Sequence, residues 1–283
     1  MRTIDSTPGA GVHGELHQDR YVGTQDLTRW NNPAGKILAS TAEKAARVLG
    51  PHATLILTLL LGALIAAVLT ALFAQVYEAV VETDGVAGLD HPVLEAAKTL
   101  RSPTANLLIT GYTDVGGTIG MPVLAATTTI VLSLRRRSWT PAILIIIASA
   151  GSLLMTIAGK ELIGRTRPPL TDAVPPYEAS ASFPSGHSLN SIVIAGTVAY
   201  LVILRLRTGR SRTWTVLAAA AFAATMGLSR VYLGHHWLTD VLAAWALGAA
   251  WLVIVITAHR LYLTTRKNHH STPNQDPVRP RTT

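Results

Sequence analysis

Long apolar stretches separated by short polar loops dominate the sequence after about residue 50. Six of them can be delimited, at about Ala53–Val80, Ala105–Leu134, Pro141–Ile163, Ser188–Leu204, Trp214–Leu233 and Leu238–Leu261. A helix needs about 20 apolar residues to cross roughly 30 Å of hydrocarbon, and most of these segments reach that length. The pattern predicts an all-α, polytopic membrane protein with six transmembrane helices.

The second segment departs from this pattern. It is too long for one clean span, and the polar, glycine-containing stretch TDVGGTIGMP interrupts it at residues 113–122. Glycine is disfavoured inside a helix, so the stretch predicts a bend. An alternative is a shorter crossing, preceded by an interfacial piece around His91–Leu100.

The two ends of the chain lack this apolar pattern. Residues 1–48 are polar and rich in Gly, Thr and Asn, which predicts a mobile N-terminal tail. Residues 265–283 include STPNQDPVRPRTT, which predicts a disordered C-terminal tail. The six-helix membrane domain is expected between them, over residues 49–264.

Composition supports a membrane protein and excludes some chemistry. Only 14% of the 283 residues are charged, against about 25% in ordinary soluble domains. The chain has no cysteine, which excludes disulfides and thiolate zinc sites. Its net charge of +8 could indicate nucleic-acid binding. Because the arginines gather at the edges of apolar segments, without a basic stripe interleaved with aromatics, membrane topology and anionic lipid explain the charge better.

The basic loops predict an orientation. Arg135–Arg137 lie between the second and third segments, and four arginines at 205–212 lie between the fourth and fifth. With six crossings these loops share one side with both termini, and excess Lys and Arg marks the cytoplasmic side. We therefore expect a cell-membrane protein with cytoplasmic termini, and with residues 81–103, 164–187 and 229–237 facing outward.

The first polar cluster on the predicted outer face is KELIGRTRP, residues 160–168. It brings Lys160, Arg165 and Arg167 within about two helical turns, and we expect no acids nearby that match all three. Ionisable groups near bilayer depth are costly unless they are paired or functional. Single cations at helix ends are often interface anchors, but three together favour a bound anion.

The second cluster is SFPSGHS, residues 182–188, at the start of the fourth segment. Ser185, Gly186 and His187 stand where a helix is expected to begin. Free amides and a positive dipole end make a helix N-terminus suitable for phosphate. The same residues are also typical of an ordinary N-cap with a surface histidine.

The third cluster is SRVYLGHHWLTD, residues 229–240. On a helix, His236 and Asp240 would share one face, and a carboxylate beside an imidazole fixes its tautomer and stabilises its charged form. His235 would point about 100° away, which predicts an interface residue. Arg230 adds an anion donor. A structural pair capping the sixth segment is the alternative.

The three clusters converge on one chemistry. Lys160, Arg167, Ser185, Gly186, His187, Arg230, His236 and Asp240 all fall at helix ends on the same predicted side. Cations, backbone amides, a carboxylate-backed histidine and a second histidine are the parts of a metal-free phosphoryl-transfer site.

These motifs resemble the type 2 phosphatidic acid phosphatase superfamily, which also includes vanadium haloperoxidases and bacterial acid phosphatases. Its pattern joins a lysine with Arg-Pro after six residues, then Pro-Ser-Gly-His, then Ser-Arg followed by His and Asp. The corresponding residues here are Lys160, Arg167–Pro168, Pro184–His187, Ser229, Arg230, His236 and Asp240. All three motifs are complete and correctly spaced, over about 80 residues, and the integral membrane lipid phosphatases of the superfamily share the six-helix layout.

The resemblance implies a role for each matching residue. His236 would attack phosphorus and become phosphohistidine, with Asp240 as its orienting partner. His187 would protonate the leaving oxygen and then activate water. Five groups would bind the phosphate and are together called the phosphate cage: Lys160, Arg167, Arg230, Ser185 and the Gly186 amide. No metal and no cofactor are implied.

The expected substrate follows from the position of the site at the outer membrane–water interface. A lipid phosphate or diphosphate places its head there while its chains stay in the bilayer. Undecaprenyl diphosphate, phosphatidylglycerol phosphate and phosphatidic acid all fit, and a prenyl diphosphate is preferred because recycling that carrier requires an outward-facing site.

Three alternatives remain open at this stage. A phosphotransferase of the same superfamily would pass the phosphoryl group to another acceptor. A membrane transporter would suit intramembrane charge, although the charges here gather at one face rather than the midplane. A zinc site could use His187, His235, His236 and Asp240.

Overall fold

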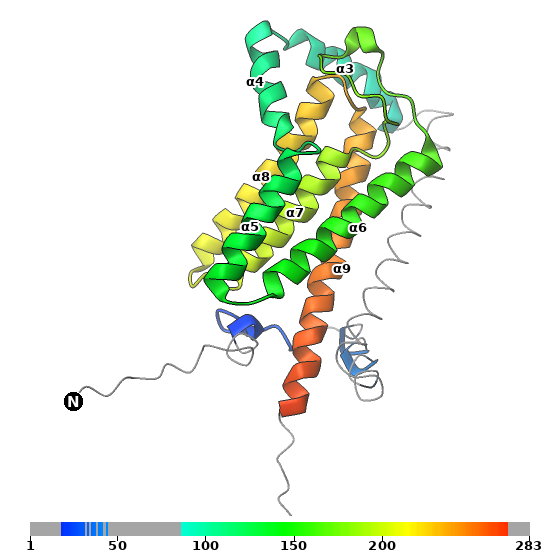
Figure 1. Cartoon of the computed structure of the whole chain (residues 1–283). Helices are drawn as coiled ribbons and strands as arrows, with labels where there is room; N and C mark the ends of the chain where they lie inside the picture. Colours follow the sequence, from blue (N-terminus) through cyan, green and yellow to red (C-terminus); the bar gives the residue numbers. More distant parts are fainter. Residues whose placement is uncertain are drawn as a thin grey trace, which may run out of the picture.

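The computed structural model describes residues 18–31, part of 33–44, and residues 86–270. Within these ranges the chain is mainly helical (Figure 1). The predicted first span and the end of the C-terminal tail, residues 271–283, lie outside the described residues. The predictions made for them stay predictions.

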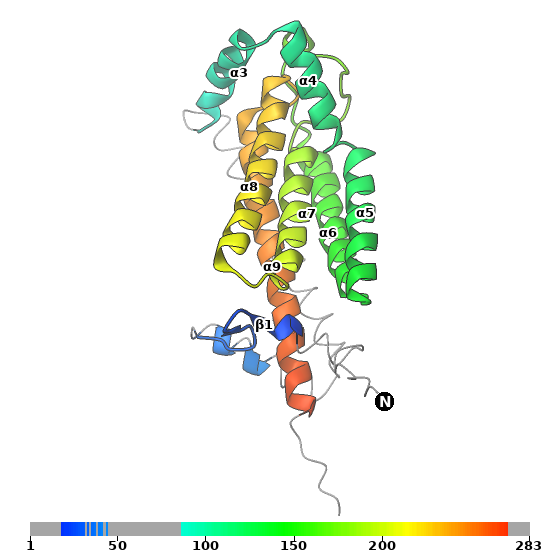
Figure 2. The same ribbon diagram turned by 90° about the vertical axis from the view of Figure 1, so that its left-hand side faces the viewer.

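Four long helices form the centre of the fold. They are α6 (Thr140–Ile163), α7 (Gly186–Ile203), α8 (Gly209–Tyr232) and α9 (Leu238–His270). All four are long and apolar enough to cross a membrane. Helix α7 contacts the other three and also α5, so it is the central helix of the bundle (Figure 2).

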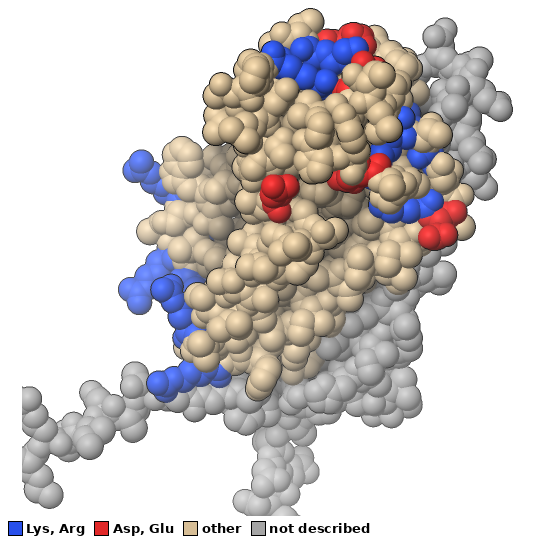
Figure 3. All heavy atoms as spheres, turned by 45° about the horizontal axis from the view of Figure 1, so that its top comes forward, with Lys and Arg blue, Asp and Glu red and all other residues tan. Residues whose placement is uncertain are grey.

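Residues on the flanks of these helices indicate what surrounds them. Large apolar side chains such as Ile146, Leu154, Leu217 and Val253 are at least half exposed. Lys and Arg gather towards the two ends of the molecule, and the surface between is mostly uncharged (Figure 3). Such a belt fits hydrocarbon rather than water, and the chain is a multi-pass membrane protein.

The second apolar segment is broken, as its glycines predicted. Helix α4 (Pro103–Asp114) ends before Gly116, and α5 (Gly120–Arg136) begins after a short turn. Before them, η1 (Val86–Leu89) leads into α3 (Asp90–Thr99), which covers the predicted interfacial piece. Helices α3 and α4 lie over one end of the bundle (Figure 1).

The core between the long helices is apolar and close-packed. Ile145 and Ala148 of α6, Leu189 and Val193 of α7, and Leu247 of α9 are all almost fully buried. Burial on this scale fixes how α6, α7 and α9 lie against one another. The ends of these helices therefore have defined positions. Such fixed ends are needed if the polar clusters at residues 160–168, 182–188 and 229–240 are to form one site.

Residues 18–31, within the predicted N-terminal tail, contain regular structure that the sequence did not predict. The mobility expected of the tail stays a prediction. Strands β1 (Tyr21–Val22) and β2 (Gln25–Asp26) form an antiparallel hairpin at the end of the bundle opposite α3 (Figure 2). Asp19 is buried and pairs with Arg205 and with Arg136, at 3.5 Å from the latter. The attachment is therefore both ionic and apolar, since Val22 and Leu27 also pack against the hydrophobic core. The ionic part is not detected by a search for apolar periodicity.

The C-terminal boundary also differs from the prediction. Helix α9 continues to His270, past the boundary expected at residue 264. Residues 265–270 contain basic and polar residues but neither glycine nor proline, so nothing in this stretch stops the helix.

Candidate active site

The predicted site residues converge at one end of the bundle. Lys160 stands in the last turn of α6, Ser185 caps α7, Arg230 lies in the last turn of α8, and Asp240 lies in the first turn of α9. Since neighbouring helices run in opposite directions, the ends of α6 and α8 meet the starts of α7 and α9 (Figure 1).

His236 and Asp240 lie together, but not for the reason given by the helical spacing. Helix α9 begins at Leu238, so His236 precedes it. Asp240 Oδ2 lies 3.4 Å from His236 Nδ1 and accepts a 3.0 Å hydrogen bond from the Trp237 amide. The carboxylate thus caps the helix start and also faces the imidazole. The capping interpretation of the pair is confirmed, and the role of Asp240 in orienting His236 stays a prediction.

The turn before α9 sets the direction of His236. Gly234 ends α8 in the left-handed region, at φ 72°, and the amides of His235 and His236 both donate to the Arg230 carbonyl. A β-carbon at residue 234 would lie 2.3 Å from the Asp172 carbonyl oxygen, so only glycine fits this turn. The reversal brings His236 beside Asp240.

His235 is not the interface residue that the sequence predicts. Its side chain is buried, and Nε2 lies 2.6 Å from the carbonyl oxygen of Val174 in the α6–α7 loop. The residue precedes α9, so the argument from a 100° rotation on that helix does not apply. The Val174 contact turns its ring away from Asp240.

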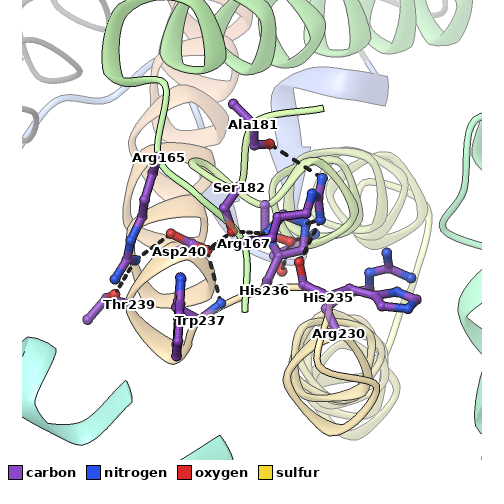
Figure 4. Close-up of polar contacts among 12 residues, drawn as sticks. Arg165, Arg167, Ala181, Ser182, Arg230, His235, His236, Trp237, Thr239 and Asp240 are labelled. Atoms are coloured by element: carbon purple, nitrogen blue, oxygen red, sulfur yellow. Dashed lines mark hydrogen bonds and ion pairs between the residues drawn. The ribbon is translucent and has the colours of Figure 1, made fainter. Parts of the chain in front are cut away.

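A hydrogen-bond network surrounds Asp240 (Figure 4). Its Oδ2 accepts from the Ser182 hydroxyl at 2.5 Å, and its Oδ1 accepts from Arg165 Nη1 at 2.6 Å. Arg165 also pairs with Asp90 of α3. Sequence reasoning counted Arg165 among unmatched cations, because Asp90 is distant in the chain and outside the three motifs.

Glu178 is the second acid that sequence reasoning missed. Its carboxylate pairs with Arg167 Nη2 at 2.7 Å and with Arg230 Nη2. The expectation of cations without nearby acids is therefore wrong for both Arg165 and Arg167. Glu178 lies in the long loop between α6 and α7, where no periodic pattern marks it.

Lys160 contacts the same loop. Its ammonium group donates to the Ser180 hydroxyl at 2.9 Å and to the Ala181 carbonyl. Arg167 also donates to the Ser180 carbonyl, at 2.7 Å, and its Nη1 lies 3.2 Å from His236 Nε2. Lys160, Arg167 and Arg230 are thus gathered around residues 178–181, close to the imidazole.

Ser185 and Gly186 stand at the start of α7, as predicted. The buried Ser185 hydroxyl accepts a 3.4 Å hydrogen bond from the Ser188 amide, and the Ser185 amide donates to the Asp240 carbonyl at 3.3 Å. These contacts serve the helix cap and tie α7 to α9. Their part in binding phosphate stays a prediction.

His187 faces the break between α4 and α5. A β-carbon added at Gly117 would lie 3.6 Å from its Nε2, and one at Gly116 would lie 3.1 Å from its Cδ2. No hydrogen bond joins the imidazole to another residue in the described part of the chain. Its nitrogens therefore remain available to a bound molecule.

Burial and charge set the ionisation of the groups outside the spans. Burial raises the pKa of Glu178, but the charges of Arg230 and Arg167 outweigh it and hold that pKa at about 2. Burial lowers the pKa of His236 to about 4, against the opposing effect of Asp240. At neutral pH Glu178 is charged and His236 is neutral. A neutral imidazole with Nδ1–H towards Asp240 presents the Nε2 lone pair to Arg167.

The zinc alternative requires a cluster of ligands. Among the residues that the structure describes, no group of three or more His, Asp or Glu side chains is arranged to hold a metal ion.

Fold and site together define a class: a helical membrane protein whose motif histidines, arginines and lysine meet at one end of its bundle. Comparison with known proteins makes this specific. Residues 123–262 match the PAP2 superfamily. Phosphatidylglycerophosphatase B of Bacillus subtilis (strain 168) is 31% identical over 177 residues, which cover 62% of this chain and 86% of that protein. The chain belongs to the PAP2 superfamily.

Two further similarities agree. The crystal structure of a transmembrane PAP2 type phosphatidylglycerolphosphate phosphatase from Bacillus subtilis matches with a TM-score of 0.59 and 30% identity, covering 66% of this chain and 92% of that one. An undecaprenyl-diphosphatase from Sulfolobus acidocaldarius is 38% identical over 74 residues, covering 26% of this chain and 32% of that protein.

Proposed function

We propose that this protein is a membrane phosphatase that hydrolyses a lipid phosphate or diphosphate through a phosphohistidine on His236. In the first step His236 Nε2 forms a bond to phosphorus and the bond from phosphorus to the leaving oxygen breaks, while His187 gives that oxygen a proton. In the second step His187 takes a proton from water, the water oxygen bonds to phosphorus, and the P–N bond breaks to release inorganic phosphate.

The observation that carries the proposal is the position of the His236 imidazole. Asp240 lies at its Nδ1, and Arg167 lies 3.2 Å from its Nε2. A fixed guanidinium at the attacking nitrogen would stabilise the charge that spreads over a transferring phosphoryl group.

A second observation supports an anion at the same place. Arg230 is buried, and its Nε has no acceptor among the described residues. The Glu178 carboxylate already pairs with Arg230 and Arg167, as two oxygens of a phosphate could. We infer that the substrate phosphate displaces Glu178 and also satisfies the donors of Arg230.

Membrane position supports a lipid substrate. The proposed site lies where spanning helices end. The exposed apolar residue Ile119 belongs to the break between α4 and α5, which His187 faces. The similar proteins include a phosphatidylglycerophosphatase and an undecaprenyl-diphosphatase. Within this class we propose an outward-facing site with a preference for a prenyl diphosphate over phosphatidylglycerol phosphate and phosphatidic acid.

The test is release of inorganic phosphate by the purified protein from a panel of lipid phosphates and diphosphates in detergent. Activity that His236→Ala abolishes supports the proposal. Absence of phosphate release from every member of the panel, or full activity of His236→Ala, would overturn it.

Two further assays test whether the reaction needs a metal and whether water is the acceptor. Turnover in excess chelator is expected to be retained, because the proposed step uses only side chains; its loss would contradict the metal-independent mechanism. Product analysis with water as the sole acceptor separates a hydrolase from a phosphotransferase, since a phosphotransferase would release little phosphate without its second substrate.

A further inference from the structure

Asp90, the first residue of α3, is buried although it belongs to none of the motifs. Its side chain is 3% exposed. Oδ1 accepts from the Thr239 amide at 2.9 Å, and Oδ2 accepts from the Thr239 hydroxyl and from Arg165 Nη2, both at 2.7 Å. A carboxylate at the amides that begin α9 also suits the positive end of that helix.

Arg165 joins this carboxylate to Asp240. Its Nη2 lies on Asp90, and its Nη1 donates to Asp240 Oδ1 at 2.6 Å and to the Thr239 hydroxyl at 2.8 Å. The guanidinium carbon also lies 5.5 Å from the Trp237 ring centre. The planar guanidinium of Arg165 is held in one orientation by hydrogen bonds to both carboxylates, and this orientation fixes the position of Asp240 Oδ1.

The two oxygens of Asp240 therefore have separate partners. Oδ1 accepts a hydrogen bond from Arg165, and Oδ2 faces His236 Nδ1 and the Ser182 hydroxyl (Figure 4). Without Asp90, Asp240 would be the only one of these two carboxylates left to pair with the Arg165 guanidinium. A carboxylate drawn towards Arg165 would support the imidazole less well, and Arg165 would lose one of the groups that hold its plane.

We infer that Asp90 is a positioning residue for the proposed nucleophile, acting through Arg165 and Asp240 on His236. The inference rests on the proposed function. Asp90 itself touches neither the imidazole nor any cation of the phosphate cage. It links α3, which lies over the end of the bundle, to the reacting histidine.

The experiment compares Asp90→Asn with the wild-type full-length protein. The isosteric amide keeps the size of the side chain but removes its charge. We expect kcat for a lipid phosphate to fall by about tenfold or more, by analogy with other residues that orient a functional histidine. Inhibition by inorganic phosphate, which binds the cage cations without a bond to the histidine nitrogen, should keep its inhibition constant.

A matched control and a double variant make the test specific. Glu95→Gln removes an exposed carboxylate from the same helix, where it pairs with Lys98, and should leave kcat unchanged. If Asp90 acts through Arg165, its substitution should cost little further activity in an Arg165→Gln background, because the two residues form one unit. Should Asp90→Asn not fold, Arg165→Lys keeps the charge without the planar fork and should show the same loss in kcat.

Three results would overturn the inference: wild-type kcat in Asp90→Asn or Arg165→Lys, an inhibition constant for inorganic phosphate that weakens in parallel with kcat, or fully additive losses in the double variant. Each differs from failure of the proposed function. An inactive His236→Ala with a normal Asp90→Asn rejects the positioning role alone, whereas a fully active His236→Ala rejects the proposed function itself.

Discussion

The carboxylate of Glu178 lies between Arg167 and Arg230, the two arginines assigned to the phosphate cage. The side chain is about one-third exposed, so it can leave towards solvent without disturbing the core. An internal anion thus occupies the position that the proposal gives to the substrate phosphate.

Replacing this anion should strengthen binding of oxyanions. Glu178→Gln removes the charge that competes for Arg167 and Arg230, and we expect vanadate to inhibit at about tenfold lower concentration, equivalent to about 1.4 kcal/mol. Inhibition kinetics with a soluble aryl phosphate measure this. Glu161→Gln, an exposed carboxylate on α6, is the control. Weaker inhibition of Glu178→Gln would mean that Glu178 supports the anion site instead of competing for it.

The adjacent histidines should behave differently. His236→Ala should abolish turnover, because His236 alone of the two faces Asp240. His235→Ala should keep most of it, since the His235 ring bonds the Val174 carbonyl, away from Asp240. Steady-state phosphate release, with thermal unfolding as a check on folding, distinguishes them. A folded but inactive His235→Ala alongside an active His236→Ala would reverse the assignment.

The low pKa of His236 predicts an acid limb in the pH profile. Burial holds this pKa at about 4, below the ordinary value near 6.5. The attacking form is the neutral imidazole, so it is present above pH 4 and lost as the pH falls through that value. With an activated aryl phosphate, kcat/KM should fall below about pH 5. An acid limb centred near pH 6.5 would show that burial does not govern the ionisation of His236.

His187 should affect both steps of the reaction. With a good leaving group the acid is scarcely needed, so His187→Ala should still form the phosphohistidine but hydrolyse it slowly. A loss of about 10²–10⁴-fold is typical for general acid–base help. Alkaline quenching after mixing with a ³²P-labelled activated ester should reveal acid-labile label on the protein, and His236→Ala should show none. Equal label in both variants would exclude His236 as nucleophile; none in either would favour direct attack by water.

Topology can be tested with single cysteines, because the chain has none of its own. Ser138 follows the arginines at the end of α5, and Thr171 lies in the α6–α7 loop. An impermeant thiol reagent applied to intact cells should label Thr171→Cys and not Ser138→Cys. The opposite result would reverse the proposed orientation and remove the preference for an outer-leaflet substrate.

Most of the helical framework follows from apolar length alone. The segment predicted at 141–163 lies within α6, and the one at 214–233 ends one residue after α8. The glycine-containing stretch marks the break between α4 and α5. Ser185 caps α7 because serine accepts from a helix amide, a local signal within four residues. Signals of this kind need no knowledge of the tertiary fold.

The acids around the site could not be predicted in the same way. Asp90 and Glu178 meet their arginines only after α3 and the α6–α7 loop fold over the end of the bundle. His236 and Asp240 were paired by assuming a helix that begins two residues too early. The pair survives because Gly234 and the Trp237 amide bring the same groups together by another route.

The buried ion pairs of Asp19 have a consequence for handling the protein. Asp19 lies at the end of the bundle opposite the proposed site and places one carboxylate between Arg136 and Arg205. These arginines follow or end different helices, so the carboxylate cross-links α5 to the end of α7. A truncated version that starts near residue 49 would keep every residue of the proposed chemistry yet lose this cross-link. We expect the truncated protein to be less stable than the full chain once it is in detergent, where the lateral pressure of the bilayer no longer holds α5 against α7.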